Sequence, residues 1–369
     1  MAQESIKCRD KCPDHSHQAQ HRGLPPHMAA SKTPLYEAST QFKNWRYSSQ
    51  SLAKVRSTLN AAAVAVIRNT FETDEPGSSS AVSFLSPDEE LLLVRLYVSK
   101  IPQLCGFFRF PEEVEATAVS YLKRFYLKNT VMDWHPKNVM LTALFLATKT
   151  TNNPISLEAY TNNIPKTSPS DVLDLEFLVA QSLGFEFAVW HAHRALWGIW
   201  LDLQTVSNTP LDRATSQSEV YDSALRHVRA SRLSDAELIY TPSQIALAAL
   251  SMASTDLATE WAESKFPSGS PSLLTLQSTL ASIRTLIEAA ARPVDVEAVR
   301  GVDLRLKLCK NPEKVVGSKA YLAKKAEEDR KAEEKRNRKV EVEKAMAEGD
   351  PFGDELANRL VDYDDDDDD

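Results

Sequence analysis

Apolar residues recur with a helical period along most of the chain. The first clear stripe lies near the start and consists of Leu52, Val55, Leu59, Ala63, Val66 and Ile67. Residues with this spacing share one face of a helix. No segment alternates between apolar and polar residues for long enough to indicate a β-strand. The pattern therefore predicts an all-α protein.

Helix-start signals divide the next part of the chain. Ser86-Pro87-Asp88-Glu89 combines a capping serine, a proline at the first helical position and a glutamate three residues after the serine. We expect this helix to reach about Ile101. Gly184 is typical of a helix end. Between these points, further apolar stripes predict helices near 112–128, 136–149, 155–162 and 171–183.

The region after this one repeats it. Pro136 and Pro242 occupy matching places, 242 − 136 = 106 positions apart, and the same offset aligns five predicted helices without a gap. In each copy the helix after the proline is apolar on nearly every face, over Val139–Ala147 and Ile245–Ala253. Such a helix must be surrounded by other helices. The sequence therefore predicts two tandem five-helix repeats, each with a central helix wrapped by four neighbours.

The duplication divides the chain into six predicted segments. They are a disordered N-terminal tail (1–34), an N-terminal helix and linker (35–84), the first repeat (85–187), the second repeat (188–292), a charged helical extension (293–346) and an acidic tail (347–369). Within the extension, residues 318–345 have mixed charge and almost no apolar stripe, which predicts a solvated helix that docks only through its start.

Composition and charge narrow the classes of function. The net charge of −8 gives no reason to expect nucleic acid as a direct ligand. No uncharged apolar run approaches the ~20 residues of a membrane helix, and the N-terminus lacks the apolar core of a signal peptide. The 4 cysteines are scattered, unlike those of a disulfide scaffold. We expect a soluble intracellular protein without a membrane partner.

Residues with reactive side chains do not form a recognisable active site. Cys8, Cys12, His15 and His17 are metal-binding types, but their spacing leaves no room for the loop and helix of a zinc finger. Acidic pairs at 89–90 and 112–113 lie in predicted first turns, where they complement the helix dipole. No glycine loop, nucleophile elbow, metalloprotease motif or kinase signature is present. We therefore expect a protein that is not an enzyme, with no catalytic residue, cofactor or metal.

Four stretches of the chain resemble the cyclin family. The most specific runs from Tyr121-Leu-Lys-Arg-Phe-Tyr through His135-Pro136 to Lys149, and it resembles the first cyclin box of the cyclin H group. Residues 39–48 are similar to that group's N-terminal helix, and residues 194–202 and 239–250 to its second box. The resemblance covers about residues 35–310 and implies two cyclin boxes flanked by N- and C-terminal helices.

The resemblance implies which residues contact a partner. In cyclins, a lysine that ends the central helix of the first box and a glutamate on its last helix reach the kinase. The matching residues are Lys149 and Glu176, and Asn152 and Glu158 fall on the same expected kinase-binding face. The second repeat has Thr255 at the position that matches Lys149. We therefore expect the first repeat to bind the kinase.

The chain departs from the family pattern at two places. Many cyclins have acidic residues after the lysine, whereas residues 150–153 here are Thr-Thr-Asn-Asn. Many cyclins also have an internal arginine–aspartate pair between their first two helices. Glu90 and Lys123 stand in the matching positions, which predicts a structural pair with its charges reversed.

The resemblance also implies a function. It indicates a regulatory subunit that binds and activates a cyclin-dependent kinase, as in the CDK-activating kinase module of TFIIH, and supports phosphorylation of the RNA polymerase II C-terminal domain and of CDK activation loops. A ring-finger assembly factor and the TFIIH core are the further partners implied, and the nucleus is the implied location. Another transcription cyclin, of the Mediator or elongation-kinase type, is the alternative. From other classes, a TFIIB-like DNA-binding factor would need a zinc ribbon and a basic surface that the sequence does not display, and a helical scaffold would bind no kinase.

Overall fold

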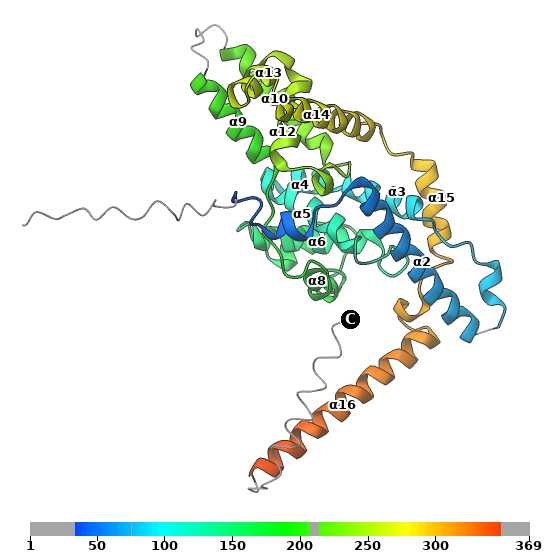
Figure 1. The fold of residues 1–369 in the computed structure, drawn as a ribbon. Helices are drawn as coiled ribbons and strands as arrows, with labels where there is room; N and C mark the ends of the chain where they lie inside the picture. Colours follow the sequence, from blue (N-terminus) through cyan, green and yellow to red (C-terminus); the bar gives the residue numbers. More distant parts are fainter. Residues whose placement is uncertain (1–33, 75, 207–213, 348–369) are drawn as a thin grey trace, which may run out of the picture.

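The computed structural model describes residues 34–74, 76–206 and 214–347, and its regular structure is helical throughout these ranges. Two bundles of helices lie one above the other in Figure 1, with the first repeat below the second. The predicted all-α class and the two central helices are therefore confirmed. The segment with Cys8, Cys12, His15 and His17 and the acidic tail from 348 onward lie outside the described residues.

The first repeat surrounds one buried helix. Its elements are α3 (Pro87–Val98), α4 (Ile101–Phe108), α5 (Glu112–Phe125), α6 (Pro136–Thr150), α7 (Leu157–Asn162) and α8 (Ser170–Ser182). Helix α6 is in contact with α3, α5 and α8, and every residue from Val139 to Thr148 on it is buried. The predicted capping box at Ser86 and Glu89 is present. Its reciprocal hydrogen bonds explain why α3 begins where it does.

Helix α4 was not predicted from the pattern of apolar residues. The expected single helix from Pro87 to about Ile101 ends at Val98, and a second helix begins at Ile101. Pro102 lies in the first turn of α4, where a proline is well tolerated because its missing N–H needs no partner. The whole stretch Pro87–Phe108 is long and apolar enough to cross a membrane by length and composition alone. In the structure it forms two separate helices whose apolar residues, including Leu93, contribute to the core of the first repeat.

The second repeat has the same plan. Its elements are α9 (Ala192–Val206), α10 (Ala214–Ser231), α11 (Ala236–Ile239), α12 (Pro242–Ala253), α13 (Thr255–Lys265) and α14 (Pro271–Ala290). Helix α12 is central and is in contact with α9, α10, α13 and α14. Thr241 and Gln244 form a capping box at its start. Residues Ile245–Ser251 of α12 are buried, as the continuous apolar run predicts.

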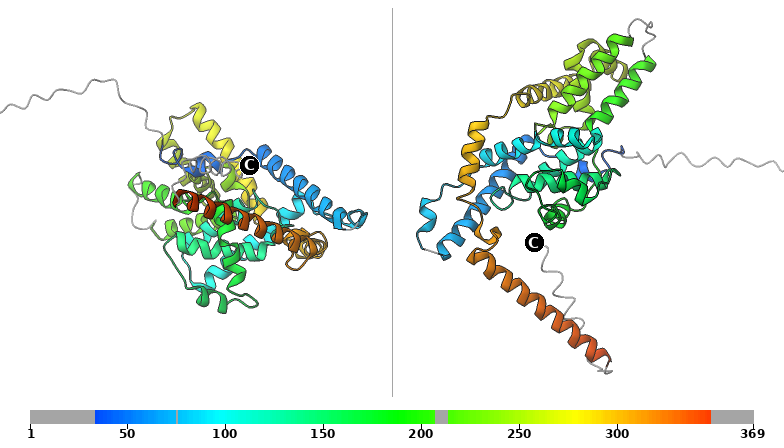
Figure 2. Two further views of the ribbon diagram at one scale, coloured as in Figure 1. Left: turned by 90° about the horizontal axis from the view of Figure 1, so that it is seen from below. Right: turned by 180° about the vertical axis from the view of Figure 1, so that it is seen from behind.

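Flanking helices tie the two repeats together on one side. Helix α1 (Thr40–Asn44) leads into the long α2 (Ser49–Asp74), and α15 (Val296–Leu306) lies against α3. The predicted charged helix is observed as α16 (Lys319–Ala347), which contacts the short η3 (Pro312–Lys314) and α2 and otherwise projects away from the body (Figures 1 and 2). Another short turn of 3-10 helix, η1 (Ser78–Ala81), follows α2.

The N-terminal segment contacts both repeats. The Gln41 side chain accepts a hydrogen bond of 2.6 Å from the backbone N–H of Trp190, in the connection between the repeats. Trp45 is 4% exposed, and its indole N–H donates to Glu186 at 2.5 Å. The backbone N–H of Tyr47 donates to the carbonyl of Leu238 in the second repeat at 2.8 Å. These contacts hold the first and second repeats in one arrangement.

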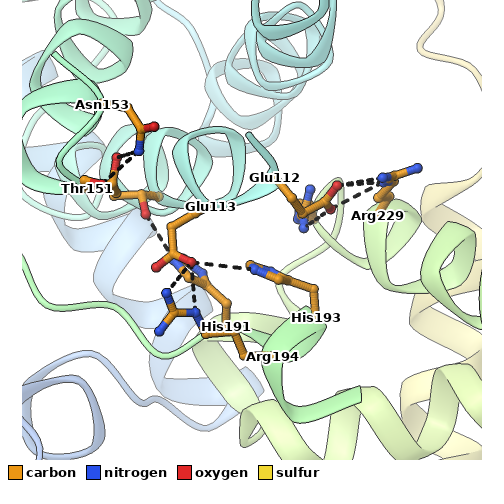
Figure 3. Close-up of polar contacts among 10 residues, drawn as sticks. Glu112, Glu113, Thr151, Asn153, His191, His193, Arg194 and Arg229 are labelled. Atoms are coloured by element: carbon orange, nitrogen blue, oxygen red, sulfur yellow. Dashed lines mark hydrogen bonds and ion pairs between the residues drawn. The ribbon is translucent and has the colours of Figure 1, made fainter. Parts of the chain in front are cut away.

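An ionic cluster forms a second part of the joint between the repeats (Figure 3). Glu112 at the start of α5 pairs with Arg229 at 2.6 Å and also with Arg232. Glu113 pairs with Arg194 at 2.6 Å. Burial raises the pKa of Glu112, but hydrogen bonds from Arg229 and the charge of Arg232 outweigh it and hold that pKa below its ordinary value. The acidic pair at 112–113 therefore connects the repeats, a role beyond the predicted complement to the helix dipole.

The predicted pair between Glu90 and Lys123 is wrong. The Lys123 ammonium group lies 3.0 Å from Glu237 and donates at 2.6 Å to the carbonyl of Ser234. The Glu90 carboxylate accepts hydrogen bonds from the Asn60 side chain and, at 2.9 Å, from the backbone N–H of Val131. Burial raises the pKa of Glu90, although these hydrogen bonds oppose the shift. Glu90 is thus bound by neutral hydrogen-bond donors, and Lys123 by the opposite charge of Glu237 and a backbone carbonyl. Both residues are satisfied without pairing with each other.

Two histidines beside the ionic cluster make stability depend on pH. His191 and His193 are stacked with ring centroids 5.2 Å apart. Burial lowers the pKa of His193 to about 4, with a further contribution from the positive charge of Arg232. Burial also lowers the pKa of His191. Both side chains are therefore neutral in the native state at neutral pH, while in the unfolded chain they titrate near 6.5.

We expect acidification from pH 7 to pH 5 to lower the free energy of unfolding. Between the unfolded pKa and the native pKa of about 4, the unfolded state binds more protons, so stability falls as pH falls. His193 alone contributes a loss of about 2 kcal/mol at pH 5. Urea denaturation at pH 7, 6 and 5 measures this change in the free energy of unfolding. The variant His193→Gln will show a shallower pH dependence than the wild type, and equal slopes would contradict the assignment.

Candidate functional site

An exposed ion pair joins the two residues that the sequence singled out. Lys149 lies in the last turn of α6 and Glu176 lies on α8, and the lysine ammonium group is 2.5 Å from the glutamate carboxylate. The Lys149 side chain is 43% exposed and that of Glu176 is 22% exposed. The lysine ammonium group lies over the ring of Phe145, 4.6 Å from the ring centroid, and this cation–π contact anchors it. The pair is thus held in place yet open to a partner.

Exposed aromatic rings lie on the helix that bears Glu176 and just after it. Phe177 on α8 is 69% exposed and Phe185, after the end of α8, is 55% exposed, with their ring centroids 6.0 Å apart. Leu173, four residues before Phe177 on the same face of α8, is 47% exposed. Large apolar side chains in such numbers on one face mark a surface that another molecule covers. We call Lys149, Glu176, Phe177 and Phe185 together the first-repeat surface.

The end of α8 explains how Phe185 comes to be exposed. Gly184 adopts φ 61° and Phe185 φ 57°, both in the left-handed region. The N–H of Phe185 donates to the carbonyl of Ala180 at 3.0 Å and that of Gly184 to Gln181 at 2.8 Å, which is the hydrogen-bond pattern of a Schellman motif. The predicted role of Gly184 as a helix end is confirmed. A bulky residue with positive φ is unusual, and its side chain here turns outward.

Asn152 has a structural role beside its predicted binding role. Its φ of 60° ends α6, and Asn153 donates its backbone N–H to the carbonyl of Thr148 at 2.8 Å, again the pattern of a Schellman motif. Asparagine tolerates this backbone conformation better than most residues. Its side chain is exposed near the end of α6. The left-handed turn at position 152 thus explains why asparagine stands there, where an acidic residue was expected.

Glu158 lies in the first turn of α7 and its side chain is exposed. Within the described ranges no ion pair joins it to Lys149. Its position complements the dipole of α7. A contact between Glu158 and a partner stays a prediction.

The first-repeat surface has the chemistry of a protein-binding site. It combines a charged pair with exposed aromatic rings, and aromatic residues are enriched where interfaces are strongest. Helix α8 lies on the side of the first repeat away from the second, so the second repeat leaves it uncovered (Figures 1 and 2). In the described part of the chain no group of three or more His, Cys, Asp or Glu residues is arranged to hold a metal ion.

The sequence contained a signal for Phe177 that the prediction did not use. Helix α8 buries Val172, Val179 and Ala180 against the core. Leu173 and Phe177 form a second apolar pair four residues apart, outside that buried stripe. An apolar pair on the solvent side of a helix indicates a binding face. Phe185 offered no such signal, because its exposure depends on the backbone turn at Gly184.

Comparison with known proteins places the chain in a family. Residues 84–188 match the family description "Cyclin, N-terminal domain", and residues 191–288 match "Cyclin C-terminal domain". "Cyclin mcs2" of Schizosaccharomyces pombe is 30% identical over 334 residues, which are 88% of this chain and 100% of that protein. The chain belongs to the cyclin family. "Putative cyclin-H" of Dictyostelium discoideum is 34% identical over 221 residues, 59% of this cyclin and 75% of that protein.

Solved structures agree with this assignment. A chain in the structure of the CAK complex from Chaetomium thermophilum bound to ATP-gamma-S has a TM-score of 0.71 and 28% identity, over 80% of this cyclin and 94% of that chain. A chain in the cryo-EM structure of the yeast TFIIK complex of Kin28, Ccl1 and Tfb3 has a TM-score of 0.56 and 31% identity, over 68% of this cyclin and 100% of that chain. Within the family the protein is a cyclin H-like cyclin, as the resemblance of residues 121–149 predicted.

Proposed function

We propose that this cyclin H-like protein binds and activates a cyclin-dependent kinase in a CDK-activating kinase module, with the first-repeat surface as its kinase-binding site. The observation that supports this is the exposed Lys149–Glu176 pair beside Phe177 and Phe185, on a cyclin whose structural relatives belong to the CAK and TFIIK complexes. Asn152 and Glu158 extend the proposed site along the end of α6 and α7. The protein's role is regulatory, and the bond-making chemistry belongs to the kinase.

Activation follows from selective binding to one kinase conformation. A protein kinase is active when the lysine on its own strand β3 pairs with a glutamate on its helix αC, and that helix can swing out of place. A rigid surface that binds only the swung-in helix shifts the population toward the active state. The buried α6 and its contacts with α3, α5 and α8 supply the rigidity. The exposed rings and charges supply the preference for one conformation.

Further partners follow from the same assignment. A subunit like the Tfb3 of the yeast TFIIK complex is the proposed ring-finger assembly factor. The TFIIH core, phosphorylation of the RNA polymerase II C-terminal domain and of CDK activation loops, and action in the nucleus complete the proposal. No membrane and no nucleic acid is proposed as a direct partner, in line with the net charge of −8.

Affinity purification of the tagged full chain, followed by identification of the bound kinase, tests the function. We expect a CDK-activating kinase together with a ring-finger subunit, and kinase activity toward C-terminal-domain peptides. A Mediator or elongation kinase in its place would transfer the protein to another group of transcription cyclins. Salt-dependent binding to DNA with no kinase would favour the TFIIB-like alternative.

Removing one exposed ring tests the kinase-binding surface. We expect Phe177→Ala to weaken kinase binding at least about tenfold, because aromatic residues at the centre of an interface contribute a large part of its binding energy. Folding stability will change little, since the ring is 69% exposed. Titration of kinase activity against cyclin concentration measures the effect. The matched control is Phe107→Ala on α4, where the ring is 62% exposed outside the proposed surface. Equal behaviour of the two variants would contradict the proposal.

A further inference from the structure

A cavity of about 190 Å³ lies where α2, α3, α5 and α14 meet. It sits at the joint between the two repeats, and none of its lining residues belongs to the first-repeat surface. A cavity of roughly 150 Å³ is known to hold a benzene molecule. This one therefore has room for a six-membered ring with a short chain, or for an aliphatic chain of similar volume.

Most of the cavity wall is apolar. Leu59 comes from α2, Leu91, Val94 and Val98 from α3, and Leu286 from α14. Val94 and Val98 are 5% and 1% exposed, so this wall is part of the core and its position is fixed. Small-molecule sites are lined mainly by such side chains, with a few polar groups that orient the ligand.

Three of the charged groups on the cavity wall already have partners. Arg56 donates two hydrogen bonds of 2.7 Å to Asp235, so these opposite charges satisfy one another. Lys123 is engaged by Glu237 at 3.0 Å and by the carbonyl of Ser234. These groups are held within the protein and are not directed at a ligand.

Glu90, a fourth charged residue on the cavity wall, also has hydrogen-bond partners. It accepts hydrogen bonds from the Asn60 side chain at 2.5 Å and from the backbone of Val131 at 2.9 Å. The Glu90 carboxylate at this point of the wall is therefore already bound within the protein.

Arg95 is different. It lies on α3 and lines the cavity, and its Nε–H is buried without any hydrogen-bond acceptor. Within the described ranges its guanidinium forms no ion pair, and it acts on Asp235 only as a more distant positive charge. The Arg95 side chain as a whole is half-buried, but a buried N–H without an acceptor is unfavourable unless a partner arrives. Arginine presents several donors in a planar fork that matches a carboxylate.

We propose that this cavity binds a small amphipathic monocarboxylate, with its hydrocarbon body against the apolar wall and its carboxylate on Arg95. Because the site is formed by both repeats and α2, the bound ligand stabilises their arrangement. The inference is independent of the kinase-binding proposal, since it concerns a different set of residues.

Calorimetric titration of the full chain with 4-phenylbutyrate and its uncharged analogue 4-phenyl-1-butanol tests the site. We expect the carboxylate to bind at least about tenfold more tightly than the alcohol, because only it satisfies Arg95. Arg95→Gln removes the charge and keeps a polar, though shorter, side chain. In this variant the two probes will bind with nearly equal affinity, while the affinity for the alcohol changes little.

A second variant tests the cavity itself. Ala289 on α14 lines the cavity at an exposed position, so Ala289→Phe fills the space without disturbing the buried core. Both probes will lose binding in this variant. Ala281→Phe, at another exposed position on the same helix outside the cavity, is the matched control and will bind both probes as the wild type does. No binding of either probe to the wild type, or binding that Ala289→Phe leaves intact, would overturn the proposal.

Discussion

Exchanging the two charges of the exposed pair, in the variant Lys149→Glu/Glu176→Lys, will leave the cyclin folded and will weaken kinase binding at least about thirtyfold. The swap preserves an ion pair between α6 and α8, and exposed pairs contribute at most about 1 kcal/mol to folding in any case. A partner that is complementary to the native charges, however, meets like charges at both positions. Like-charge contacts in an interface are unfavourable by several kcal/mol.

This swap separates two explanations that alanine variants cannot. If Lys149 and Glu176 served only each other, the exchanged pair would restore the interaction, and kinase activation would equal that of the wild type. That result would remove both residues from the proposed kinase-binding site. The measurements are kinase activity as a function of cyclin concentration and thermal unfolding of the cyclin alone. The variant Lys149→Ala/Glu176→Ala will fall between the wild type and the swap, because it loses attraction without adding repulsion.

The chain offers a close control for the same experiment. Lys324 and Glu313 form an ion pair of 2.7 Å whose side chains are 42% and 29% exposed, against 43% and 22% for the first pair. It joins α16 to η3, outside the first-repeat surface. Exchanging these two charges will leave kinase binding within about twofold of the wild type. A comparable loss in both swaps would indicate a general effect of charge on the cyclin.

The parts of the fold that the sequence could predict are those governed by local rules. The buried helices α6 and α12 follow from continuous apolar runs, and their starts follow from a proline after a capping residue. Likewise α3 begins at the capping box that Ser86 and Glu89 define. Each of these signals lies within a few residues of the structure that it produces. Lys149 and Glu176 were instead assigned to the site from the family resemblance, because their contact joins two helices and no local signal predicts it.

Contacts between distant segments could not be predicted in the same way. Glu90 and Lys123 are each satisfied by residues that the helical pattern does not bring near them, Val131 and Glu237 among these. The charges of residues 112–113 are visible in the sequence, but nothing local states that Arg229 lies across the joint. Phe185 needed the left-handed turn after Gly184 to become exposed. Long-range partners are chosen by how the two repeats meet, and that depends on the whole fold.

Arg232 is the residue in the joint whose loss we expect to destabilise the cyclin most. Its side chain is 8% exposed and pairs with Glu112 and, at 2.6 Å, with Glu115, both at the start of α5 in the other repeat. Removing this buried arginine takes the partner from Glu115 and leaves Glu112 with Arg229 alone, and breaking a buried ion pair is unfavourable by about 3–5 kcal/mol. We therefore expect Arg232→Ala to lower the free energy of unfolding by about 3 kcal/mol, measured by urea denaturation at pH 7.

Arg229 provides the comparison, because it binds the same carboxylate from the surface. It pairs with Glu112 at 2.6 Å, but its side chain is 50% exposed, so water can replace the lost partner. Arg229→Ala will therefore lower the free energy of unfolding by less than about 1 kcal/mol. Both arginines contribute the same charge to Glu112, so the contrast between them measures the combined effect of the burial of Arg232 and of its second ion pair, with Glu115. If the two variants lose equal stability, the joint is held by its apolar contacts and by the N-terminal segment, and the ionic cluster only fixes how the repeats are oriented.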